Sequence, residues 1–179
     1  MGRQFEQVWP RPNSEKEKGA YERFGYLSQT ELSIRLGNIL NKGVWNVVNE
    51  AVGIYGDLVT AYIVRSQDTK TLSDWKHSVK PPTVGAKERL AIALDYAYER
   101  RRHKENDLPA VTTILGRNPV INGHCLAEAL HVVDSKDLVY VHEASMQSVK
   151  YEKNDIDFDA REPHNALLKY FPTWHDEES

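Results

Sequence analysis

The sequence lacks a second cysteine and any long hydrophobic run, and each absence excludes a class of protein. With Cys125 alone, an internal disulfide framework is impossible, and a reducing compartment is expected. No apolar stretch approaches the roughly 20 residues that a membrane-spanning helix needs. Residues 1–18 are polar and charged, which predicts that they are not a secretory signal. We therefore expect a cytoplasmic protein without membrane segments.

Motifs of common enzyme chemistry are also missing. The sequence contains neither a glycine-rich phosphate loop after a strand nor a Gly-x-Ser-x-Gly nucleophile turn. His124, Cys125, His131 and His142 are the residues that could suggest a metal site or a nucleophile, but no second Cys-x-x-Cys or His-x-x-x-His pair completes a ligand set. Cys125 is better interpreted as a small buried hydrophobic residue. We expect no catalytic residues, no metal and no cofactor.

Basic residues are not in excess either. The 26 aspartate and glutamate residues outnumber the 23 lysine and arginine residues, so the net charge is −3. A protein that coats nucleic acid with its whole surface is excluded, and any DNA contact must come from a local basic patch.

What the sequence does contain is helical periodicity. Apolar residues recur at i, i+3, i+4 and i+7, the spacing of a buried helix face, and no segment reads as a convincing strand. Residues 120–124 are predicted to form a turn. The predicted helices span 28–41, 44–55, 84–102, 108–115, 126–133 and 138–149, with a pair of short helices within 56–80. This pattern predicts an all-α fold.

The short helix pair is the stretch on which the interpretation of the rest of the chain depends. A polar turn joins its two helices, and Pro81-Pro82 prevents the second from continuing. Asp68 is the predicted N-cap of the second helix, because its carboxylate can accept from the first-turn amides. The apolar positions are Leu58, Val59, Tyr62 and Ile63 on the first helix, and Leu72, Trp75 and Val79, expected to face inward, on the second. The outward positions of the second helix are Thr69, Lys70, Thr71, Ser73, Lys76 and His77.

A short amphipathic helix with small polar and basic residues outside suits insertion into the DNA major groove, so we interpret the pair as a helix-turn-helix. The alternative is an ordinary pair of packed helices without a DNA role. The basic run 100–104 leaves a similar choice. We favour a solvated helix end, which suits the negative end of the helix dipole, over a DNA-phosphate site.

The order of motifs carries further information. Leu72-Ser73-Asp74-Trp75 is followed by Pro81-Pro82, by the Arg89-Leu90 helix and by a specific segment, Ile114-Leu115-Gly116-Arg117-Asn118-Pro119-Val120-Ile121-Asn122-Gly123. Over roughly residues 55–149 the chain resembles antitoxins of the Xre/MbcA/ParS class. The turn between the motif helices is one residue longer than usual there, and Arg65 stands where glycine is common.

The resemblance implies a small all-α protein with a helix-turn-helix helical bundle and a C-terminal toxin-binding module. Such a protein neutralises a cognate toxin, typically of the NAD-consuming RES class, represses its own operon and forms a homodimer on double-stranded DNA. The DNA-facing residues would be Thr69, Lys70, Thr71, Ser73, Lys76 and His77, with Arg65, Gln67 and Lys80 as flanking phosphate contacts. The toxin-facing region would centre on Arg117, Asn118, Asn122 and Gly123.

Four segments are therefore expected. They are a weakly ordered arm (1–25), a helical domain with the helix-turn-helix (26–104), a small helical partner-binding module (105–149) and a weakly ordered acidic tail (150–179). Within the tail, residues 162–174 are predicted to fold on a partner. Two alternative functions stay open: a protein-interaction module that does not bind DNA, and a stand-alone Xre-like repressor without a toxin.

Overall fold

The computed structural model describes six parts of the chain: residues 29–77, 79–102, 109–116, 120–121, 124–153 and 170. These parts are almost entirely helical, which confirms the predicted all-α fold. The helices are α3 (Gln29–Leu40), α4 (Val44–Ile63), α5 (Lys70–Lys76), α6 (Val84–Arg102), α7 (Ala110–Ile114), α8 (Leu126–Val132) and α9 (Leu138–Lys153), with a 3-10 turn η1 (Ser135–Asp137) before α9. The predicted arm (1–25) and most of the predicted tail (150–179) lie outside the described residues.

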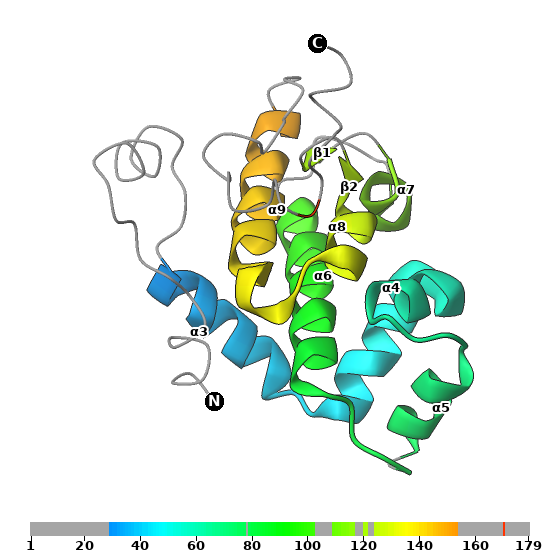
Figure 1. The fold of residues 1–179 in the computed structure, drawn as a ribbon. Coiled ribbons are helices and arrows are strands. Elements are labelled where there is room, and N and C mark those ends of the chain that lie inside the picture. Colours follow the sequence, from blue (N-terminus) through cyan, green and yellow to red (C-terminus); the bar gives the residue numbers. More distant parts are fainter. Residues whose placement is uncertain are drawn as a thin grey trace.

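Helix α6 is the centre of the fold, and α3, α4, α7 and α9 all pack against it (Figure 1). Every residue from Glu88 to Ala97 is buried. The sequence predicted a helix with one apolar stripe, whereas the middle of α6 is enclosed on all sides. A helix enclosed in this way belongs to the core, not to the surface.

Helix α4 consists of two segments that meet at Gly56. Gly56 has φ 84° and ψ 165°, a conformation that residues with a Cβ rarely adopt, so the helix bends there. The Thr60 hydroxyl donates to the Ala51 carbonyl oxygen across the bend at 3.3 Å, and Tyr55 Oη donates to the Ala93 carbonyl oxygen of α6 at 2.5 Å. The predicted helix end at Gly56 is confirmed.

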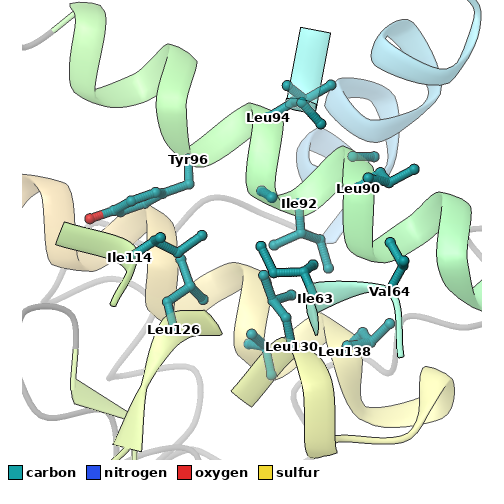
Figure 2. Close-up of a cluster of buried hydrophobic side chains, with 14 of the residues drawn as sticks. Ile63, Val64, Leu90, Ile92, Leu94, Tyr96, Ile114, Leu126, Leu130 and Leu138 are labelled. Atoms are coloured by element: carbon teal, nitrogen blue, oxygen red, sulfur yellow. The ribbon is translucent and has the colours of Figure 1, made fainter. Parts of the chain in front are cut away.

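One hydrophobic core joins the two predicted helical modules. Figure 2 shows Ile63 and Val64 at the end of α4 beside Leu90 and Ile92 of α6, with side chains of α7, α8 and α9 around them: Ile114, Leu126, Leu130 and Leu138. Apolar residues on both sides of the predicted boundary at 105 are therefore buried together. The boundary itself stays a prediction.

A buried ionic network ties three helices together. Asp95 of α6 accepts from Arg35 Nη2 of α3 at 2.8 Å and lies 2.6 Å from His142 Nε2 of α9. Burial by itself would raise the pKa of Asp95, but the hydrogen bonds and charges of His142 and Arg35 outweigh it and lower the pKa to about 2. Asp95 therefore stays ionised and holds α3 and α9 on α6.

Three expectations are wrong in detail. Two short strands, β1 (Val120–Ile121) and β2 (His124–Cys125), pair antiparallel where only a turn was expected, because two-residue strands are too short to show alternation. Leu58 is 80% exposed and Val79 is 70% exposed, although both lie at apolar positions of the helix pair. Val79 lies beyond the end of α5, so helical spacing no longer applies to it.

Within the described residues, no helix combines the length and the hydrophobicity needed to cross a bilayer.

Candidate nucleic-acid interface

The predicted helix pair is present as the second segment of α4, residues 57–63, and α5. Leu72 and Trp75 anchor α5, since they are only 1% and 6% exposed, respectively. The residue directly before α5 is Thr69, which makes no side-chain capping bond. The predicted capping contact of Asp68 is present, because its carboxylate accepts from the Thr71 amide at 3.3 Å. Figure 1 shows α5 at the edge of the fold, across α6 from α9. The outer face of α5 is therefore open to a partner.

The turn between the two helices begins with a left-handed residue. Arg65 has φ 63°, the only positive φ at a non-glycine residue in the described part of the chain. The Ser66 amide donates to the Ala61 carbonyl oxygen at 2.9 Å, and the Arg65 amide donates to that of Tyr62 at 3.1 Å. This pair of bonds is a Schellman motif, whose left-handed position favours glycine. Glycine adopts this positive φ without strain, which explains why glycine is common at the position of Arg65 in the antitoxins that the chain resembles.

The predicted DNA-facing residues of α5 and its flanks differ in exposure. Gln67, Lys70, Ser73, His77 and Lys80 are exposed, whereas Thr69, Thr71 and Lys76 are half-buried. Two of the exposed side chains have partners of their own. His77 Nδ1 lies 2.9 Å from the Ser73 carbonyl oxygen, and Lys80 Nζ lies 3.9 Å from the Asp74 carboxylate.

This stretch is more basic than the protein as a whole. Residues 65–80 contain four cations, Arg65, Lys70, Lys76 and Lys80, and two carboxylates, Asp68 and Asp74, against a net charge of −3 for the whole chain. It therefore supplies the local basic patch that a DNA contact would require.

Arg65, however, also caps the C-terminal end of α8, a role that the sequence did not indicate. Its Nε and Nη2 donate to the His131 and Val132 carbonyl oxygens at the end of α8, and Nη2 lies 3.6 Å from Asp134. The role of Arg65 as a phosphate contact stays a prediction, but part of its guanidinium is already engaged.

Arg89 of α6 caps the same end of α8. Its Nε donates to the Leu130 carbonyl oxygen at 2.7 Å, and its Nη2 donates to that of Val133 at 2.6 Å. The last carbonyl groups of a helix lack partners within the helix and carry its negative dipole end. Two arginines from distant elements therefore cap α8, and no local sequence pattern could have identified them.

A cleft of about 720 Å³ lies beside these arginines, between the turn and the start of α6. Its lining includes Arg65 and Gln67 of the turn, Thr71 and Trp75 of α5, and Gly85 and Arg89 of α6. We call it the arginine cleft. It adjoins the predicted DNA-facing surface, because the turn and α5 contribute to both.

The predicted partner-binding residues, Arg117, Asn118, Asn122 and Gly123, lie outside the described residues. On the surface of α4, Leu58 is 80% and Tyr62 is 40% exposed. The Tyr62 ring stacks on the His131 ring of α8, with a centroid distance of 4.1 Å and an interplanar angle of 4°. Sequence periodicity treated both residues as core positions and so missed this exposed apolar pair.

The metal hypothesis gains no geometric support where the structure can be described. No group of three or more His, Cys, Asp or Glu side chains converges there as a metal site would require. His124 pairs with Glu128 at 2.8 Å, His142 is buried beside Asp95, and Cys125 is half-buried.

No protein-family model matches the chain, and comparison with curated proteins and with solved structures finds no significant match.

Proposed function

We propose that this chain is a cytoplasmic DNA-binding regulator of the antitoxin type, which reads its own promoter as a dimer through α5 and neutralises a cognate toxin. The observation that carries the DNA-binding part is α5 itself. Leu72 and Trp75 anchor this helix, while the side that carries Lys70, Ser73 and His77 faces solvent in a locally basic stretch. A fixed helix with an exposed polar and basic face is what major-groove recognition needs.

The toxin-binding part rests on the resemblance of residues 55–149 to Xre/MbcA/ParS antitoxins. The exposed pair Leu58 and Tyr62 supports a protein partner, because apolar side chains that remain exposed side by side often mark an interaction surface. The same pair also favours the second candidate, a protein-interaction module in which the helix pair does not bind DNA.

DNA binding can be tested by titrating a labelled fragment of the protein's own promoter at several salt concentrations. The variant is Lys70→Ala/Lys76→Ala, which removes two cations from the α5 surface. If both lysines contact phosphates, the dimer loses four phosphate contacts, and the slope of log K against log[salt] should become shallower by about 4, because each contact contributes about 0.9.

A matched control removes two cations elsewhere. Lys42→Ala/Lys136→Ala leaves the same net charge, and both side chains are exposed on other parts of the fold. This control should bind like the wild-type protein. Equal weakening in both variants would mean that only net charge matters, and unchanged binding in the α5 variant would exclude α5 as the DNA-reading helix.

The toxin part has a separate readout. Expression of a small neighbouring reading frame should arrest growth, and co-expression of this chain should restore it. Leu58→Asp should abolish the rescue if the exposed pair contacts the toxin. If no neighbouring frame is toxic, a stand-alone repressor is the better description.

A further inference from the structure

The guanidinium group of Arg89 lies at the wall of the arginine cleft, and only two of its three nitrogens donate to protein acceptors in the described part of the chain. The residue is only 4% exposed, and its Nε and Nη2 both donate to carbonyl oxygens of the α8 end. Its third nitrogen, Nη1, has no hydrogen-bond partner in the described part of the chain. Arg89 lines the cleft, so Nη1 can donate a hydrogen bond to an acceptor that enters it.

Gly85 makes room for this nitrogen. A Cβ at residue 85 would lie 2.7 Å from Arg89 Nη1 and 2.7 Å from Ser135 Oγ, which is closer than real Cβ contacts allow. The guanidinium and the hydroxyl therefore converge on a spot that is open only because residue 85 has no side chain. Gly85, Arg89 and Ser135 all line the cleft.

The lining of the cleft contains two arginines, Arg65 and Arg89, and one carboxylate, Asp68. Burial, and then the nearby charge of Arg65, lower the pKa of Arg89 to about 10, so Arg89 stays positive at neutral pH. The one carboxylate in the lining, Asp68, already accepts from the Thr71 amide. Asp134, outside the lining, lies 3.6 Å from Arg65. An anion beside Nη1 would offset the repulsion between the two arginines and accept a charge-assisted hydrogen bond from Nη1.

We propose that the arginine cleft binds a small molecule through a phosphate or carboxylate group, held by Arg89 Nη1 and the Ser135 hydroxyl. Guanidinium groups pair well with both kinds of oxyanion. The cleft volume of about 720 Å³ exceeds what a single ion fills, and it lies in the range of small-molecule sites. The oxyanion would therefore be one end of a larger molecule, and the other end would contact the turn and α5. This inference does not depend on DNA binding.

The test uses the full chain without DNA. Inorganic phosphate and acetate are titrated separately, with sodium chloride holding the ionic strength constant, and the amide chemical shifts of Ser66, Thr71 and Gly85 are followed by NMR. At least one anion should give saturable shifts at these three residues. A stronger response to phosphate would assign a phosphate group, and a stronger response to acetate would assign a carboxylate.

Gly85→Ala is the decisive variant, because its methyl group would occupy the space between Nη1 and the hydroxyl. It should weaken anion binding at least about tenfold, the effect of losing one charge-assisted hydrogen bond. Gly53→Ala is the matched control, since a Cβ at residue 53 of α4 meets no atom within 4 Å, and it should bind like the wild-type protein.

If Gly85→Ala does not fold, Ser135→Ala replaces it, because that change removes the hydroxyl and adds no volume. It should weaken binding about three- to tenfold, as expected for one neutral hydrogen bond. The proposal is overturned if neither anion gives saturable shifts, or if the folded cleft variant binds as tightly as the Gly53→Ala control.

Discussion

The buried carboxylate of Asp95 should be the most sensitive single charge in the described fold. Asp95→Asn keeps the volume of the side chain but removes the charge that Arg35 and His142 share. Arg35 would retain its ion pair with Glu99, whereas His142 has no exposed surface from which to reach water. We therefore expect a clear loss of stability with the fold retained.

The size of the loss follows from the pKa of Asp95. His142 and Arg35 lower it from 3.8 to about 2, against the opposing effect of burial. A difference of about 2 pKa units corresponds to about 2–3 kcal/mol of stability at neutral pH. That is a large share of the stability of an ordinary domain.

The assay is urea denaturation of both proteins between pH 2 and pH 7. The pKa of Asp95 is lower in the folded than in the unfolded chain, so its stabilisation is complete above about pH 5 and is lost as the pH falls through 3.8 towards 2. The wild-type protein should therefore exceed Asp95→Asn by about 2–3 kcal/mol at pH 7, and the gap should close in acid.

The control is Asp57→Asn, which changes an exposed carboxylate and should shift stability by less than about 0.5 kcal/mol at any pH. A gap between wild-type protein and Asp95→Asn that did not depend on pH would refute the reasoning. It would mean that packing, not charge, accounts for the loss.

Two further predictions concern a second buried carboxyl and the bend of α4. Burial raises the pKa of Glu88, which is 3% exposed, to about 7, while Arg89 partly opposes the shift. The unfolded chain therefore loses the Glu88 proton near pH 4.5 and the folded protein only near pH 7, so the wild-type protein loses stability over this range. Glu88→Gln should be more stable than the wild-type protein by up to about 3 kcal/mol at pH 8 but not at pH 4. Equal pH profiles in urea melts would contradict this. Gly56→Ala should lower the free energy of unfolding by about 1–3 kcal/mol, because Gly56 has a φ of 84°. Gly53→Ala, within regular helix, should be neutral or stabilising by up to about 1 kcal/mol. Equal melting temperatures of the two variants would count against the bend at Gly56.

Helix boundaries were predictable because their causes lie close together in the sequence. Helix α6 spans the predicted residues 84–102; it begins after Pro81-Pro82, and its last turn is basic. Gly56 marks the bend of α4, and the helices after residue 124 begin and end within a few residues of their predicted positions. Spacing also identified Leu72 and Trp75 as the buried side of α5.

Burial was less predictable where helical spacing gives no information about neighbours. Leu58 has the spacing of a core residue, but no element of the described fold covers it. Conversely, Glu88, Arg89 and Asp95 are buried although their side chains are ionisable, because α6 is surrounded by other helices. Periodicity indicates which residues share a face, and only packing decides whether that face is covered.

The sequence by itself determined that this chain is helical, where its helices begin and end, and that α5 carries a basic, polar outer side. The tertiary structure decided how the charges are used. Arg65 and Arg89 cap α8 across separations of 41 to 67 residues, and Arg35, Asp95 and His142 join three helices. The physical reason is that helix formation depends on neighbouring residues, whereas the partner of a buried charge depends on which surfaces pack together.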